Sequence, residues 1–211
     1  HLAAASPLFP GPCVSRLAAA HTAAGQVLDH RGLSPAHVAC LVDANQSFAS
    51  IRTACAIRLT TDPLLTSLGV GCLPLACASG SYRLIRTLMR LGAPLDQPDN
   101  RGMTAVHYAA GCAGGDLAAL RVLRLLDESR MGDRDAPGGG LGNFVVLDVP
   151  RDTSGQTPLH VAAWSRHLQT MQRLARLWAQ RLPLDASATY PLGPLLMYAP
   201  WEEQTATRAL L

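Results

Sequence analysis

The sequence contains no lysine, so all eighteen basic side chains of this 211-residue chain are arginines. A phosphate-binding loop requires a lysine followed by serine or threonine after its glycines. The glycine-rich segment 138–142 is followed by neither, and we expect it to be a flexible linker. Its glycines therefore do not indicate a nucleotide site.

Aromatic residues are also scarce, at 5% of the chain, whereas the hydrophobic fraction of 48% is large enough for a folded core. Most of the apolar residues are alanine and leucine, which favour helices over strands. No apolar run approaches the roughly 18 residues that span a membrane, and no secretory signal is visible. These observations predict an all-α protein without a membrane segment.

Motifs for metal binding and catalysis are missing as well. The six cysteines form no C-x-x-C pair, and we expect buried free thiols in a reducing compartment, hence a cytoplasmic or nuclear protein. Zinc needs about four converging donors, and no such cluster is visible, so no metal and no cofactor are expected. No G-x-S-x-G or other nucleophile motif accompanies the serines and histidines, which argues against an enzyme.

What the chain does contain is one repeated helix start. In the segment 157–163, Thr157 suits the N-cap and Pro158 the first helical position, where no N–H is needed. Related segments occur at 34–40, 73–78 and 104–110. An Asp-x-x-Gly turn precedes the motif at 29–32, 99–102 and 152–155, where glycine supplies a positive φ and aspartate caps the turn's amides. The repetition predicts a repeat protein.

The clearest unit runs from Leu73 to Gly102. Its second helix is expected at 82–90, with an apolar stripe at helical spacing, and Gly92 is placed to end it. The segment 92–96 then leads towards the next turn. These residues resemble the ankyrin repeat, whose consensus is Asp-x-x-Gly-x-Thr-Pro-Leu-His-x-Ala-Ala, a leucine-rich second helix and Gly-Ala-Asp-Val-Asn. The resemblance implies an all-α solenoid of stacked helix-turn-helix units over nearly the whole chain.

Aligning the motif's histidine position gives about six repeats across residues 1–211, at His1, His37, Ala76, His107, His160 and Leu196. By subtraction the steps are 36, 39, 31, 53 and 36 residues, against a period of about 33 for this family. The longest step holds a segment at about 127–149 that we expect to be a flexible insert. Because the chain starts at His1, we also expect it to be a piece or a processed form of a longer protein.

The resemblance implies non-catalytic protein binding, as an adaptor, scaffold or regulator, and it assigns roles to individual positions. The motif histidine ties down its turn through hydrogen bonds to neighbouring turns. The positions of the motif that are expected to have a structural role are Gly32, His37, Gly102, Thr104, His107, Gly155, Thr157 and His160. Turn tips and first helices form the concave recognition surface. The residues at the variable contact positions are His30, Arg31, Leu33, Val70, Cys72, Asn100, Arg101, Met103, Thr153, Ser154 and Gln156, with Trp164 just beyond the last motif.

Several alternatives stay open at this stage. Trp164 contacts a partner or packs against the insert. The arginines at helical spacing in 83–90, 121–124 and 173–176 form solvated faces, or else a basic surface for an acidic partner or nucleic acid. We expect a protein partner and no nucleic acid. A narrower resemblance, carried by the repeat number and the segment 193–199, is to the inhibitors of NF-κB, which bind transcription factors. A substrate-recognition or structural subunit of a larger assembly is the other alternative.

Overall fold

The computed structural model describes residue 16 and the segments 27–55, 65–130 and 150–179. These segments contain eight α-helices in four consecutive pairs. The pairs are α3 (Pro35–Leu41) with α4 (Asn45–Ala54), α5 (Cys72–Ser79) with α6 (Tyr82–Arg90), α7 (Ala105–Ala110) with α8 (Asp116–Arg130), and α9 (Pro158–Trp164) with α10 (Leu168–Ala179). The predicted all-α fold is confirmed.

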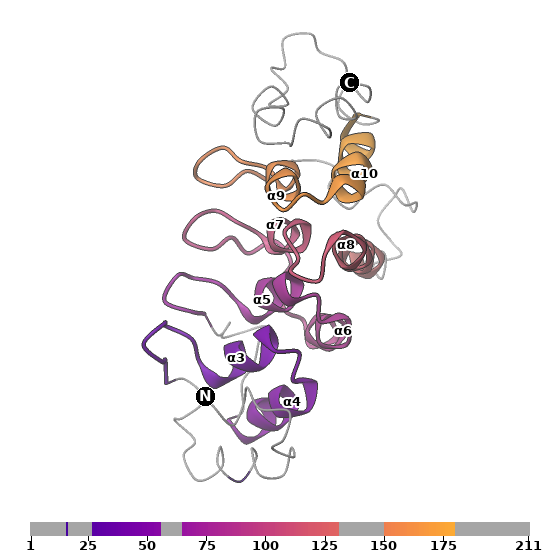
Figure 1. Cartoon of the computed structure of the whole chain (residues 1–211). Helices are drawn as coiled ribbons and strands as arrows, with labels where there is room; N and C mark the ends of the chain where they lie inside the picture. The colour runs from indigo at the N-terminus through magenta and orange to yellow at the C-terminus, as the bar shows by residue number, and fades with distance from the viewer. Residues whose placement is uncertain (1–15, 17–26, 56–64, 131–149, 180–211) are drawn as a thin grey trace.

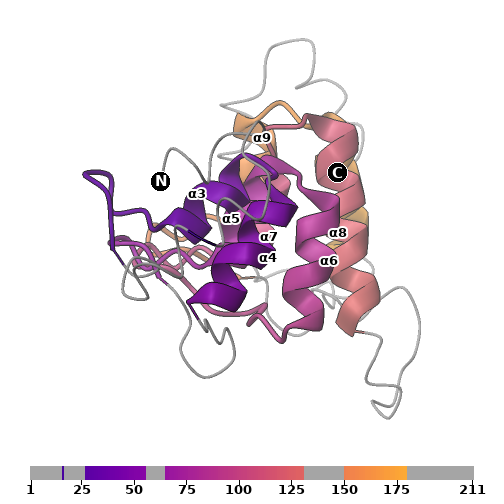
Figure 2. The same cartoon turned by 90° about the horizontal axis from the view of Figure 1, so that it is seen from below.

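The pairs stack in one direction to form two layers of helices. The first helices of the pairs, α3, α5, α7 and α9, contact one another in sequence, and α6, α8 and α10 do the same behind them. Each pair is preceded by an extended turn, and Figure 1 shows these turns projecting side by side from the edge opposite the second helices. Figure 2, seen along the stack, places the first helices between the turns and the second layer. The architecture is a solenoid.

A single hydrophobic core lies between the two layers. The first helices contribute small buried residues such as Ala76, Ala109 and Ala162, which let neighbouring helices approach closely. The second helices contribute large ones, including Leu88 and Leu126, which are fully buried. Full burial of a leucine side chain stabilises a fold by about 1.5–3 kcal/mol. In α6 the predicted stripe packs inward, with Leu84, Ile85 and Leu88 buried and Met89 packed against the core. The buried side chains form one continuous cluster through all four pairs.

The structure corrects the register of the second described repeat. Gly69 has φ +75°, in the same left-handed region as the turn glycines Gly32, Gly102 and Gly155, and α5 begins three residues later at Cys72, with Gly71 as its N-cap. Counting from the glycine, Pro74 occupies the histidine position, so the placement of Ala76 there is wrong. The steps between consecutive described repeats become 37, 33 and 53 residues by subtraction.

The boundary of the expected insert also changes. Helix α8 continues to Arg130, so residues 127–130 are helical and do not belong to a flexible insert. A long helix forms here because good helix-forming residues continue from the buried stripe of α8 into its last turn. Residues 131–149, and the repeats predicted around His1 and Leu196, lie outside the described residues.

Candidate protein-binding surface

The turns that precede each pair of helices are built around an acidic side chain. In the third turn, Oδ1 of Asp99 accepts hydrogen bonds from the amides of Arg101 and Met103, each at 2.8 Å. Asp152 accepts in the same way from Ser154 at 2.9 Å and from Gln156 at 2.7 Å. These bonds satisfy amides that the tight turn leaves without backbone partners, and they orient the tip residues outward.

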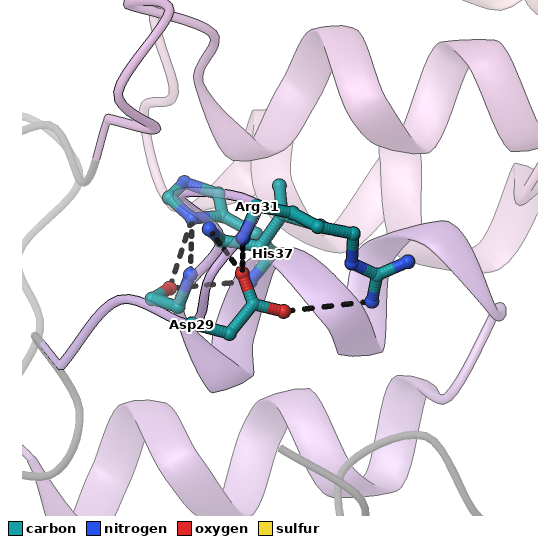
Figure 3. A network of polar contacts seen from close by, with 5 residues as sticks. Asp29, Arg31 and His37 are labelled. Carbon is teal, nitrogen blue, oxygen red and sulfur yellow. Dashed lines mark hydrogen bonds and ion pairs between the residues drawn. The ribbon is translucent and has the colours of Figure 1, made fainter.

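Asp29 organises the first described turn in the same manner (Figure 3). Its Oδ1 accepts from the amides of Arg31 and Leu33, both at 2.9 Å, and its Oδ2 lies 3.5 Å from Nη2 of Arg31. The hydrogen bond from the Leu33 amide, helped by the amide and the guanidinium of Arg31, lowers the pKa of Asp29 below its usual value. The carboxylate is therefore ionised at neutral pH and holds the Arg31 side chain at the tip.

Backbone hydrogen bonds join the four turns into a row. The amide of Ser67 donates to the carbonyl of Gly32 at 3.2 Å, that of Asn100 to Leu68 at 3.0 Å, and that of Thr153 to Arg101 at 2.7 Å. Consecutive tips must approach closely for these bonds to form. At Gly102, with φ +77°, an added Cβ would lie 3.0 Å from the Thr153 amide nitrogen, so the next turn occupies the space of a side chain.

The motif histidines fasten the turns to the helices. The amides of Ser34, Thr104 and Thr157 donate to Nδ1 of the histidine three residues on, at 3.0, 3.1 and 3.1 Å. Because these amides are donors, each Nδ1 is an acceptor and the neutral ring carries its hydrogen on Nε2. In His107 this Nε2 donates to the carbonyl of Gln156 in the next turn, at 3.3 Å. Burial lowers the pKa of His107 below its usual value, which keeps the ring neutral.

The last two described pairs are clamped together behind the turns. Asp116, at the start of α8, accepts from the amides of Gln169 and Thr170 at 2.7 and 2.9 Å and from the Thr170 hydroxyl at 2.6 Å. His167 donates from Nδ1 to the carbonyl of Ala110 at 2.9 Å. These contacts fix the spacing of the third and fourth turns, although more than fifty residues of sequence separate the partners.

The structure places most of the predicted contact residues along the tips. The exposed ones are His30, Arg31, Asn100, Arg101, Thr153 and Ser154, and the half-buried ones are Leu33, Met103 and Gln156. Val70 and Cys72 are buried, at 5% and 4% exposure, so their placement on the contact surface is corrected. They lie inside because the second turn ends at Gly69, so Val70 follows the tip and Cys72 is already the first residue of α5. The tip residues at that turn are Ser67 and Leu68, which the sequence reasoning missed and which Gly69 identifies.

Trp164 is the last residue of α9. Its side chain is 54% exposed, a large value for an indole, and Leu68 at the second tip is equally exposed. Trp164 lies one helical turn after Val161, whose Cγ1 would be 2.8 Å from a Cβ added at Gly111 of the preceding pair. The absence of a side chain at Gly111 thus lets α9 pack closely against the preceding pair.

Within the described segments, no group of three or more histidine, cysteine or acidic side chains is arranged to hold a metal ion. No helix in the same segments is long and apolar enough to cross a membrane. The five cysteines at 40, 55, 72, 77 and 112 are free thiols, and all but Cys55 are buried.

Comparison with known proteins agrees with this geometry. None of the curated proteins compared with the chain matches it. A family model described as ankyrin repeats, in three copies, matches residues 73–181, which is more than half of the chain. The match runs from α5 to the end of α10 and includes two of the three histidine clamps, at His107 and His160, and two of the acidic turns. On both sequence and structure, the chain belongs to the ankyrin-repeat family.

Proposed function

We propose that this chain is a non-catalytic protein-binding module that acts as an adaptor, scaffold or regulator. Ankyrin repeats are generally protein–protein interaction modules. The observation that carries the proposal is the row of turns held together by backbone hydrogen bonds from Gly32 to Thr153. Such a surface is ordered before a partner arrives, so little conformational entropy opposes binding.

The side chains along the row indicate the chemistry of the partner. Arg31 and Arg101 place two exposed guanidinium groups at the tips, and Leu68 and Trp164 add two exposed apolar groups. Arginine and tryptophan are the residue types most often found to dominate interfaces. We infer a protein partner that meets the tips with carboxylates and receives the Trp164 indole in an apolar pocket.

The test uses a partner captured by a photo-crosslinking residue introduced at Asn100, at the centre of the row. Its affinity is then measured for the chain and for the double variant Arg101→Ala/Trp164→Ala. Loss of two dominant contacts, at about 2 kcal/mol or more each, weakens binding by roughly a thousandfold or more. Gln46→Ala, which shortens an exposed side chain of α4 in the other layer, is the control and leaves the affinity unchanged. Equal affinity for the double variant would refute this placement of the site.

The same capture experiment separates the narrower possibilities. Recovery of a Rel-type transcription factor supports an NF-κB-inhibitor-like regulator, and co-sedimentation with a large particle supports a subunit of an assembly. We further propose that the protein works inside the cell, because its described cysteines are free thiols, which persist in reducing compartments.

A further inference from the structure

The layer of second helices carries a concentration of positive charge on its outer surface. In each helix the exposed positions recur three, four and seven residues apart, and arginine occupies most of them. The exposed arginines are Arg83, Arg86 and Arg90 in α6, Arg121 and Arg124 in α8, and Arg173 and Arg176 in α10. These helices lie side by side on the side away from the turns (Figure 1), so their arginines form one face, which we call the back face.

Little negative charge balances the back face. Helices α6 and α10 contain no acidic residue, and α8 contains Asp116, Asp127 and Glu128. The Asp116 carboxylate is already occupied by the amides that begin α10. Among the described residues, no ion pair involves Arg83, Arg86 or Arg121. Like charges three and four residues apart weaken a helix, so this pattern is unfavourable for the fold alone and favours an anionic partner.

A groove runs into this face between α6 and α8. It has a volume of about 590 Å³, which suits a side chain or a short peptide segment. Its floor is aliphatic, formed by Ala118, Val122 and Leu125, and its walls include Arg121 and Tyr82. The groove exists because Gly80 and Ala118 are small where the two helices meet.

A second cation is held beside the groove. The Arg86 guanidinium carbon lies 6.0 Å from the centre of the Tyr82 ring, within the range of a cation–π contact. Arg86 from α6 and Arg121 from α8 therefore supply positive charge from both helices that form the groove. An apolar floor with cationic sides matches an acidic segment that carries one apolar side chain.

We propose that this groove binds an acidic peptide segment of a protein partner, which inserts a leucine-sized side chain between α6 and α8. Duplex nucleic acid supplies the negative charge, but its phosphates offer no aliphatic group for the floor. Bases stack on aromatic faces, and Tyr82 is the aromatic residue of the described lining. The site is separate from the turn tips, and its existence does not depend on the function proposed for them.

Fluorescence polarisation with the whole chain tests the proposal. The probe is a labelled peptide of glutamates with one central leucine, compared with the same peptide carrying glycine at the centre. Replacing the leucine by glycine weakens binding about tenfold, because the aliphatic floor loses its occupant. The double variant Arg86→Glu/Arg121→Glu weakens binding of the leucine peptide at least about tenfold.

The control for charge is Arg52→Glu/Arg166→Glu, which changes the net charge equally but on α4 and on the turn between α9 and α10, and changes peptide affinity by less than about twofold. Ala118→Leu, which fills the groove without altering charge, weakens the leucine peptide and spares the glycine peptide. Helical circular dichroism establishes that each variant is folded. Equal binding of the two peptides, or full binding by the Arg86/Arg121 variant, would overturn the proposal. The proposal would also be overturned if duplex DNA bound more tightly than the leucine peptide and the Arg86→Glu/Arg121→Glu variant lost that binding. The back face would then recognise nucleic acid.

Discussion

Gly102 and Gly155 allow the contact between consecutive turns to be measured separately from backbone strain. Both have a left-handed backbone, with φ +77° and +78°. At Gly102 an added Cβ would lie 3.0 Å from the amide nitrogen of Thr153 and 3.1 Å from Cα of Asp152. At Gly155 nothing in the described part of the chain lies within 4 Å of such an atom. Alanine at either position meets the same strain, but only at Gly102 does it meet a neighbour.

The expected losses of stability follow from this difference. A left-handed alanine costs about 1–2 kcal/mol, and Gly155→Ala is expected to lose that amount. Gly102→Ala loses the same amount and also displaces the next turn, because the atoms it meets are backbone atoms that cannot rotate away. That displacement breaks the hydrogen bond from the Thr153 amide to the Arg101 carbonyl, which is 2.7 Å long in the parent chain. The loss of this bond costs about 1 kcal/mol of stability. The total for Gly102→Ala is about 2–3 kcal/mol.

Urea unfolding at 25 °C, followed by circular dichroism, gives the free energy of unfolding of both variants and of the parent chain. The quantity of interest is the difference between the two alanine variants, in which the strain cancels. A larger loss for Gly102→Ala by about 1 kcal/mol supports the close contact between turns. Equal losses would mean that the turns do not support one another, and the argument for a preformed row would fail.

Three further predictions concern the clamps. The pKa of His107 is lowered in the fold, so the unfolded chain binds more protons below pH 6.5. The contribution of a neutral His107 to stability is therefore complete above that pH and decreases as the pH falls. In His107→Gln, the free energy of unfolding in urea should depend less on pH between pH 7 and 5 than in the parent chain. Asp116→Ala removes three hydrogen bonds at the start of α10 and should cost about 0.5–2 kcal/mol in the same assay, with Asp116→Asn recovering part of it. Tyr108→Phe removes a 2.6 Å bond from the phenol to Oδ2 of Asp99 and should lower the melting temperature, whereas partner affinity, measured by titration, stays within about twofold if the tips alone are recognised.

The sequence was sufficient wherever a local rule determines the structure. Local motifs of this kind are the acidic turns at 29, 99 and 152 and the capped helices at 104 and 157. Their hydrogen bonds join residues at most eight positions apart, so the sequence motif is sufficient to predict them. The all-α fold followed from the same features. The register near residue 70 was wrong because Leu73-Pro74-Leu75 imitates Thr-Pro-Leu, whereas the backbone is set by the positive φ of Gly69.

Other features depend on contacts between distant repeats and have no local signal. Asp116 resembles any acidic residue in a first helical turn, and only stacking brings the start of α10 to its carboxylate. The back-face groove requires Gly80 and Ala118, which belong to different repeats, to meet where α6 and α8 pack. Periodicity did indicate the exposed arginines, but not the apolar floor beneath them, because burial against a neighbouring helix is a property of the stack.

The second described turn shows most clearly that the tip surface is a property of the array. Thr66 replaces the aspartate and accepts from the Val70 amide at 3.0 Å, and the N-cap Gly71 makes no side-chain capping bond. The neighbouring repeats supply the hydrogen bonds that this turn does not make within itself. Gly32 accepts from the Ser67 amide on one side, and on the other Asn100 donates to Leu68 at 3.0 Å and, through Nδ2, to the Ser67 carbonyl at 3.4 Å. The exposed Leu68 is thus positioned by residues of two other repeats. A partner that binds across the tips depends on those repeats even where it touches neither, since their backbone fixes the turn that it does touch.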